Sequence, residues 1–221
     1  MRKTCLPDNV AGIGLHVSAL PGPCGIGEIG LHARWFVDRL CDAGLAVWQF
    51  LPVGPTGYGD SPYQLLSTFA GNEMLIDIHD LAERRLLDPD AAAALTALPA
   101  GQVDFARLIP RKQQLLAAAA ERFVQNADRE LRLGFDAFLQ ANDASWLHDY
   151  ALYRVAKSDH DQRPWTDWPP GPGRTRARGV AGAAGRHRRP YRAHQDSPVP
   201  VLPAMATTAP ARAGPWRGAL W

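Results

Sequence analysis

Hydrophobic residues recur at helical spacing early in the chain. Within residues 32–43 the apolar positions are spaced i, i+3, i+4, i+7 and i+8, the pattern of an amphipathic helix. These positions are Ala33, Phe36, Val37, Leu40 and Cys41. Gly44 follows directly, at the place where a helix C-cap is expected. The sequence therefore predicts a helix over 32–43 that ends at Gly44.

The next segment, AVWQFLPV at residues 46–53, is mostly apolar and has the length of a strand. It is bounded by glycine and proline, as a strand buried on both faces would be. A helix that leads into a buried strand indicates a parallel sheet. Residues 1–80 are thus predicted to be part of an α/β domain.

From Ile78 to Lys157 the pattern becomes helical. Four segments are predicted to be helices, and their ranges are Leu81–Leu87, Ala91–Leu98, Pro110–Leu131 and Ser145–Ala156. Glycine and proline separate them at Pro99, Gly101 and Gly134. Aromatic and leucine side chains in the last part predict a helical cap that buries aromatic rings; they are Phe135, Phe138, Leu139, Trp146, Tyr150 and Tyr153.

Charge is distributed unevenly along the chain. From Pro169 onward there are nine Arg, no Lys and one acid, Asp196, so this tail carries 9 − 1 = +8. The net charge is +2, which leaves 2 − 8 = −6 for residues 1–168. The tail arginines lie among Pro, Gly and Ala without hydrophobic periodicity, so the pattern favours a disordered tail over a nucleic-acid-binding face.

Composition limits location and cofactors. No run approaches the roughly 18 consecutive apolar residues that cross a bilayer, and the start MRKTCLPDNV lacks the apolar core of a secretory signal, so we expect a cytoplasmic protein. The three cysteines, Cys5, Cys24 and Cys41, lack metal-ligand spacing and are interpreted as buried or incidental thiols.

The segment GIGEIG at Gly25–Gly30 fits the dinucleotide-binding pattern GxGxxG. That pattern alone is weak, because a nucleotide fold needs a strand directly before it and an acid after the next strand. Pro21 and Pro23 lie just upstream, and the next strand ends in Leu51–Val53. A glycine-rich turn that passes close to its neighbours is the favoured interpretation.

The segment GPTGYGDSPYQ at Gly54–Gln64 directly follows the predicted strand. Loops at the carboxyl ends of parallel strands carry ligand-binding side chains in α/β enzymes. Tyr58 and Tyr63 offer flat surfaces for sugar rings, and Asp60, Ser61 and Gln64 offer hydrogen bonds for hydroxyl groups. A carbohydrate site and a purely structural turn are both compatible with these residues.

Three segments between Gly12 and Leu81 carry a family resemblance: LHVSALPGPCGIGEIG, AVWQFLPVGPTGYGDSPYQ and STFAGNEMLIDIHDL. They closely resemble the opening of the amylomaltase family of 4-α-glucanotransferases, glycoside hydrolase family 77. Further along, FDAFLQANDASWLHDYALYRVAK and PWTDWP resemble the helical insertion of that family. The resemblance covers Gly12 to Trp168.

The resemblance implies part of a (β/α)8 barrel (a TIM barrel) with a helical insertion subdomain, and Ala46–Val53 as its first strand. The implied domains are a barrel segment over 1–77, a helical subdomain over 78–168 and an out-of-frame tail over 169–221. The implied function is transfer of α-1,4-glucan segments to maltodextrin, maltose or glucose acceptors through a covalent glucosyl-enzyme. We expect no cofactor, no metal ion, no nucleic-acid partner and no association with a membrane. A non-catalytic glucan-binding module is the alternative.

The resemblance also assigns roles to side chains of the Gly54–Gln64 loop. Tyr63, with Ser61 beside it, would line the donor-sugar part of the active site, and Tyr58 would belong to a second glucan-binding surface. Asp60 is interpreted as shaping the loop. The catalytic aspartate and glutamate of the family come from strands downstream of position 168, so no residue here is assigned as catalytic.

The tail has the Arg, Ala, Gly and Pro bias of GC-rich DNA read in a wrong frame. A one-base shift of His194–Ala206 permits IKILQFLFYRQW, which resembles the helix after PWTDWP in this family. We therefore expect a frameshift between Trp168 and His194. A chain of this kind is expected to be a truncated, inactive fragment.

Overall fold

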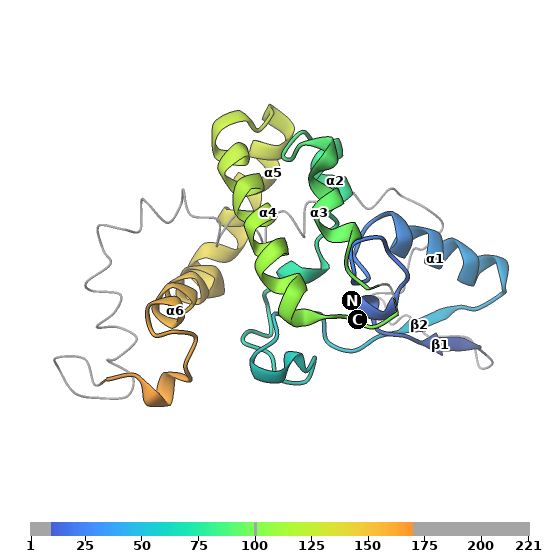
Figure 1. Ribbon diagram of the computed structural model, residues 1–221, viewed down its shortest axis with the longest axis horizontal. Coiled ribbons are helices and arrows are strands. Elements are labelled where there is room, and N and C mark those ends of the chain that lie inside the picture. The colour runs from blue at the N-terminus through green and yellow to red at the C-terminus, as the bar shows by residue number, and fades with distance from the viewer. Residues whose placement is uncertain (1–9, 100, 170–221) are drawn as a thin grey trace. The chain divides into compact units, whose positions relative to one another are not determined.

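The computed structural model describes residues 10–99 and 101–169 (Figure 1). The chain divides into two compact units, with Ala119 the last described residue of the first and Ala120 the first residue of the second. The predicted tail, its disorder and its change of frame lie outside the described residues. The predicted domain limits at 77 and 168 stay a prediction.

The first unit contains a parallel β-α-β arrangement. Strand β1 (Gly12–Gly14) pairs with β2 (Val47–Gln49) in parallel, in the register Gly12 to Val47 and Gly14 to Gln49. Helix α1 (Leu31–Asp42) lies between them in sequence and packs on the pair, with the rings of Phe36 and Trp48 5.0 Å apart (Figure 1). The parallel sheet expected from the sequence is confirmed.

The predicted strand over 46–53 differs from the observed one in three respects. Only Val47–Gln49 form a strand, and β1 precedes it, so β2 is the second and not the first strand among the described residues. Val47 and Trp48 are half-buried and Gln49 is exposed, so the strand is not buried on both faces. Two strands are described in this sheet, and so the neighbours that would cover β2 on both faces are not among the described residues.

The end of α1 follows from the predicted glycine. Gly44 has φ of 71°, the left-handed region where glycine has no Cβ penalty. The amide of Leu45 donates to the carbonyl of Leu40, and that of Gly44 to the carbonyl of Cys41. This pair of bonds is the Schellman motif, which satisfies carbonyls at the end of the helix.

The remaining helices of the first unit are short except for one. Three short 3-10 turns lie at Val17–Ala19, Tyr58–Asp60 and Glu73–Leu75. Helix α2 spans Ile78–Glu83, a further 3-10 turn spans Pro89–Ala92, and α3 spans Ala93–Thr96. The predicted segments at Leu81–Leu87 and Ala91–Leu98 thus correspond to shorter helices.

Helix α4 (Phe105–Asn126) begins before the predicted start at Pro110 and ends before the predicted end. The carboxylate of Asp104 accepts a hydrogen bond from the amide of Arg107, which caps the start of the helix. Pro110 lies within the second turn of the helix, where it removes one main-chain hydrogen bond. The predicted helix over Pro110–Leu131 is therefore two helices, with a break near Asp128.

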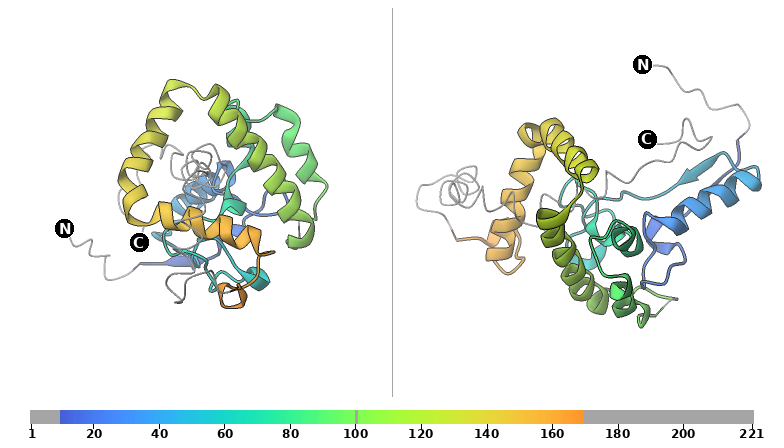
Figure 2. Two further views of the ribbon diagram at one scale, coloured as in Figure 1. Left: turned by 90° about the vertical axis from the view of Figure 1, so that its left-hand side faces the viewer. Right: turned by 90° about the horizontal axis from the view of Figure 1, so that it is seen from above.

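The second unit contains the end of α4 and two further helices, α5 (Arg129–Asn142) and α6 (His148–Asp159), joined by a π-helical turn at Asp143–Leu147. Figure 2 shows the chain changing direction between α4 and α5 and again between α5 and α6. Gly134 lies inside α5, so its prediction as a break is wrong. The capping carboxylate of Asp128, which accepts from the amide of Leu131, starts this helix instead.

Aromatic rings contact one another in the second unit, but of the aromatic residues predicted to be buried only Tyr150 is buried. The rings of Phe123 and Phe135 lie 5.2 Å apart, and Trp146 lies 6.1 Å from Tyr150. Tyr150 is buried, whereas Phe135 and Trp146 are half-buried. The 3-10 turn Trp165–Asp167 is the last helical element among the described residues.

Candidate functional site

The Gly54–Gln64 loop follows β2 from its carboxyl end. Its base is closed by backbone hydrogen bonds, from the amide of Gly57 to the carbonyl of Gln64 (2.9 Å) and from Leu66 to Pro55 (2.8 Å). A bridge between Thr56 and Leu65 lies between these bonds. These contacts join the two ends of the loop, so its base is fixed as in a β-hairpin.

The tip of the loop has a left-handed backbone at two consecutive residues. Gly59 has φ of 80° and Asp60 has φ of 53°, a conformation that Asp adopts more readily than most residues. Burial raises the pKa of the Asp60 carboxyl above its ordinary value. The conformation reverses the chain just before Ser61.

Tyr63 is exposed in this loop, with 73% of its surface accessible. Its amide lies 3.4 Å from the hydroxyl of Ser61, which is half-buried. Gln64 is exposed, and its amide donates to the carbonyl of Ser61. The backbone of Tyr58 is described as part of a 3-10 turn, and its side chain lies outside the description.

The structure describes four of the five predicted side chains on this short loop, with Tyr63 exposed at its surface. Asp60, Ser61 and Gln64 flank it in sequence. An exposed ring beside hydroxyl, amide and carboxyl groups can stack on the C–H face of a sugar and hydrogen-bond to its rim. Their roles in substrate binding stay a prediction.

The Gly25–Gly30 loop contains an ion pair that the sequence did not reveal. The ammonium group of Lys112, on α4, donates to the carboxylate of Glu28 and to the carbonyl of Met74 (2.8 Å). Lys112 is completely buried and Glu28 is 6% exposed. Burial raises the pKa of Glu28, and the charge of Lys112 opposes that shift. No local signal marks this pair, because its members are 84 residues apart.

Cys24 lies beside this pair and is also buried. Burial, followed by the negative charge of Glu28, raises the pKa of its thiol to about 12. A thiol with so high a pKa is protonated at neutral pH and therefore unreactive. This agrees with the interpretation of Cys24 as a buried or incidental thiol.

Asp77 caps two helices at once. One carboxylate oxygen accepts from the amides of His79 and Asp80 at the start of α2, and the other accepts from the amide of Leu31 at the start of α1 (3.1 Å). A Cβ atom at Gly30 would collide with this carboxylate. Gly30 is therefore needed for the close approach of Asp77.

These contacts explain the glycines of GIGEIG without a nucleotide. A Cβ atom at Gly27 would collide with the carbonyl of Val17, and Glu28 is buried against Lys112. The favoured prediction, a turn that passes close to its neighbours, fits the structure.

His16 is a second residue that sequence reasoning missed. It follows β1 at the carboxyl end of the strand, where barrel enzymes place their active sites. Burial lowers the pKa of His16, and a hydrogen bond to the backbone of Leu51 opposes that shift. Its Nδ1 is buried and has no hydrogen-bond partner within the described ranges. The imidazole is therefore neutral near pH 7.

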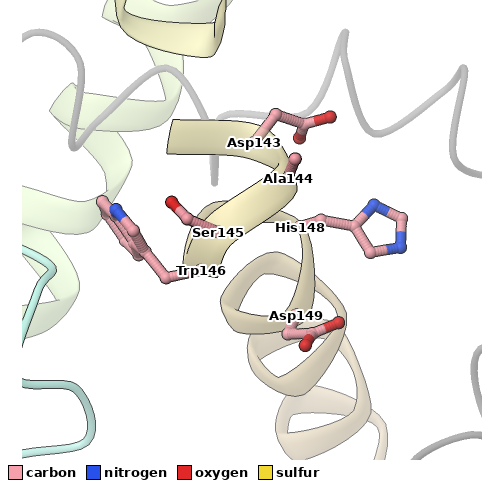
Figure 3. Close-up of a pocket in the computed structure, with 6 residues that line it drawn as sticks. All are labelled: Asp143, Ala144, Ser145, Trp146, His148 and Asp149. Atoms are coloured by element: carbon pink, nitrogen blue, oxygen red, sulfur yellow. The ribbon is translucent and has the colours of Figure 1, made fainter. Parts of the chain in front are cut away.

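A hollow of about 150 Å³ lies at the π-helical turn in the second unit (Figure 3). Its lining residues all come from one stretch of chain: Asp143, Ala144, Ser145, Trp146, His148 and Asp149. Ligand pockets usually hold about 300–1,000 Å³. This hollow is too small to enclose a glucan chain.

Neither a cluster of metal ligands nor a membrane-spanning helix is found within residues 10–99 and 101–169. No three His, Cys, Asp or Glu side chains there are grouped so that they could hold a metal ion. None of the helices described there is long and apolar enough to cross a bilayer.

Comparison with known proteins supports the resemblance seen in the sequence. The sequence profile of the glycoside hydrolase 77 family, described as 4-alpha-glucanotransferase, matches residues 15–195. The chain is 47% identical to the 4-alpha-glucanotransferase of Thermus thermophilus over 161 residues, which are 72% of this chain and 31% of that protein. It is 40% identical to the Streptococcus pneumoniae (serotype 4) enzyme over 167 residues, 75% of this chain and 32% of that protein. The chain therefore spans about a third of the length of these relatives.

A solved structure shows the same fold. The amylomaltase of Streptococcus agalactiae in complex with acarbose matches with a TM-score of 0.73 at 25% sequence identity, over 90% of this chain and 38% of that one. The β-α-β arrangement and the helices that follow it are accordingly part of a (β/α)8 barrel with its helical insertion. Together with the family profile, this match places the chain in the 4-α-glucanotransferase family of glycoside hydrolase family 77.

Proposed function

We propose that this chain provides glucan-binding residues of a 4-α-glucanotransferase, with Tyr63 as the surface on which a glucose unit stacks. Ser61, Asp60 and Gln64 supply hydrogen bonds around it. The observation that carries the proposal is the exposure of Tyr63, at 73%, on a loop whose base is closed by backbone hydrogen bonds. Holding the ring on a fixed base reduces the conformational entropy lost on binding.

The substrates we propose are α-1,4-glucans, with maltodextrin, maltose or glucose as acceptor. The structure that matches this chain is that of an amylomaltase in complex with acarbose. Tyr58, on the same loop, is proposed to contribute to a second glucan-binding surface. We further propose that the protein acts in the cytoplasm and needs no cofactor.

The proposed reaction proceeds with retention of configuration. A carboxylate attacks the anomeric carbon, the glycosidic bond breaks as a second carboxylic acid protonates the leaving oxygen, and a covalent glucosyl-enzyme forms. The 4-hydroxyl of an acceptor then attacks that intermediate and gives its proton back to the second carboxylate. We assign neither carboxylate to a residue of this chain, and we expect the 221-residue chain alone to be inactive on maltotriose.

A non-catalytic glucan-binding module is not favoured. The curated relatives named above are transferases, and the chain aligns with about a third of each. The family profile covers residues 15–195 and so includes both the Gly54–Gln64 loop and the helical segment.

Calorimetric titration of the chain with maltoheptaose tests the binding role. We expect Tyr63→Ala to weaken binding by about tenfold, which corresponds to about 1.4 kcal/mol. Trp165→Ala, which removes a 48% exposed aromatic residue of the second unit, serves as the matched control and should bind as the wild type does. Equal affinity of Tyr63→Ala and the wild type would remove Tyr63 from the site.

A further inference from the structure

Lys112 places a charge in the interior of the first unit. Its side chain is completely buried on α4, and its ammonium group donates to the carboxylate of Glu28 and to the carbonyl of Met74 (2.8 Å). Replacing a buried ion pair by apolar residues of similar volume is often neutral or stabilising, so the pair alone does not account for a lysine here. The second contact, to the backbone of Met74, is the one that reaches another part of the unit.

The segment around Met74 is buried, and its main-chain groups have specific partners. Met74 is 7% exposed and Leu75 is 2% exposed. The amide of Met74 donates to the side-chain oxygen of Asn72 (2.9 Å), and the carbonyl of Leu75 accepts from the amide of Ile29 (2.7 Å). A buried carbonyl is rarely left without a donor, and Lys112 is the donor for the carbonyl of Met74.

The same segment is bonded to the base of the Gly54–Gln64 loop. The amide of Asn72 donates to the carbonyl of Val53 (2.8 Å), the residue directly before the loop. Three successive hydrogen bonds therefore connect Lys112 to the base of the loop, by way of Met74 and Asn72.

Close packing accompanies these hydrogen bonds. A Cβ atom at Gly54 would lie 2.8 Å from the carbonyl of Ser67 and 3.3 Å from that of Ala70. The chain that leads to Asn72 thus packs against the first residue of the loop. A shift of this chain would move the loop with it.

We propose that Lys112 is a positioning residue for the Gly54–Gln64 loop. By fixing the contact between Met74 and Asn72, it holds the backbone that presents Tyr63. The inference rests on the proposed function, because it takes this loop as the glucan-binding element. A side chain that is held in place before the ligand arrives loses less conformational entropy on binding. Loss of the Met74 contact therefore weakens glucan binding although no group that touches the glucan is removed.

Two variants of the 221-residue chain separate the Met74 contact from the ion pair. Glu28→Gln removes the negative charge and leaves Lys112 able to donate to the carbonyl of Met74. Glu28→Gln combined with Lys112→Met removes that donor as well and leaves no unpaired buried charge. Calorimetric titration with maltoheptaose should show about fivefold weaker binding for the double variant than for Glu28→Gln alone.

Hydrogen exchange of the same proteins without glucan reports the loop directly. The amides of Asn72 and Gly57 donate in the hydrogen bonds of the loop base, so we expect them to exchange about tenfold faster in the double variant than in Glu28→Gln. The amide of Leu45, which donates at the end of α1, should exchange at the same rate in both. A loss of overall stability alone would speed exchange at all three amides alike.

A further variant breaks the path at its second hydrogen bond. Asn72→Ala removes the acceptor of the Met74 amide and leaves the ion pair in place, so we expect about fivefold weaker binding of maltoheptaose. Asp104→Ala is the matched control, because it removes a carboxylate that caps α4 outside this path, and it should bind as the wild type does. Far-ultraviolet circular dichroism of each variant checks that it folds.

Equal exchange at Asn72 and Gly57 in Glu28→Gln and in the double variant would overturn the inference, and so would equal affinity of these two proteins for maltoheptaose. If the double variant does not fold, equal binding by Asn72→Ala and Asp104→Ala overturns it. Absence of binding by the wild-type chain would contradict the proposed function instead. Exchange at the two amides would then still decide whether Lys112 holds the loop.

Discussion

The two glycine-rich loops that follow β1 and β2 are used in opposite ways. The Gly25–Gly30 loop is packed against the unit, with Glu28 buried against Lys112 and Gly30 against Asp77. The Gly54–Gln64 loop is closed at its base and exposes Tyr63 at its surface. Both loops are rich in glycine, so glycine content does not indicate which of them binds a ligand. The loops differ in the exposure of one side chain, because Glu28 is buried and Tyr63 is exposed.

The largest loss of stability is predicted for the buried ion pair of Glu28 and Lys112. Lys112→Met leaves the carboxylate of Glu28 buried without its partner, and breaking a pair in this way destabilises by about 3–5 kcal/mol. Urea unfolding measures the loss. The double variant Glu28→Gln with Lys112→Met should recover most of it, because neither charge then remains. A single variant as stable as the wild type would show that the pair does not hold the Gly25–Gly30 loop.

The next largest loss of stability is expected for substitution of Gly30. Gly30→Ala puts a Cβ atom against the carboxylate of Asp77 and disturbs caps of α1 and α2 together, so we expect a loss of about 2–3 kcal/mol. Thermal unfolding measures it. Gly101→Ala is the control, since a Cβ atom there meets no other atom within 4 Å, and it should leave stability nearly unchanged. Equal effects of the two changes would contradict the role of Gly30.

At Tyr63 the expected effect on stability is small. Tyr63→Ala should change the free energy of unfolding by less than about 0.5 kcal/mol, because the side chain is exposed. Tyr150→Ala, which removes a ring that is 8% exposed, should cost about 3 kcal/mol by comparison. Chemical denaturation of both variants checks the contrast. A large loss at Tyr63 would mean that its ring packs against the protein instead of being available to a ligand.

The smallest effect concerns pH. Because burial raises the folded-state pKa of Asp60 above 3.8, its contribution to stability is fully present below that pH and is lost as pH rises through the raised pKa. Asp60→Asn should remove this fall from the stability profile of the chain between pH 3.8 and the raised pKa. A wild-type profile identical to that of Asp60→Asn would contradict the assigned burial of the carboxyl.

The sequence predicted elements whose signals are local. The helix over 32–43 and its end at Gly44 follow from apolar spacing and from the left-handed preference of glycine, and α1 differs by one residue at each end. The sequence pattern predicts one helix over Pro110–Leu131 and misses the break at Asp128, whose carboxylate caps the new helix. Strand β1 was missed because its sequence, GIG, has no run of β-branched residues.

The candidate site was predictable only where the chemistry lies within one loop. The composition of Gly54–Gln64 indicated an exposed aromatic residue among polar groups, and Tyr63 is exposed as expected. The pairing of Glu28 with Lys112 and the double cap by Asp77 depend on residues 84 and 46 positions apart in sequence. Such contacts are made by tertiary folding, so no local pattern could reveal them.

The most direct test of the account compares the two loops in one measurement. Amide chemical shifts of the 221-residue chain are followed by nuclear magnetic resonance during titration with maltoheptaose. The account predicts shifts within residues 56–66, largest around Tyr63, and none within residues 25–30. Shifts confined to residues 25–30, or no response at residues 56–66 at saturating maltoheptaose, would contradict the assignment of the glucan-binding role to the Gly54–Gln64 loop.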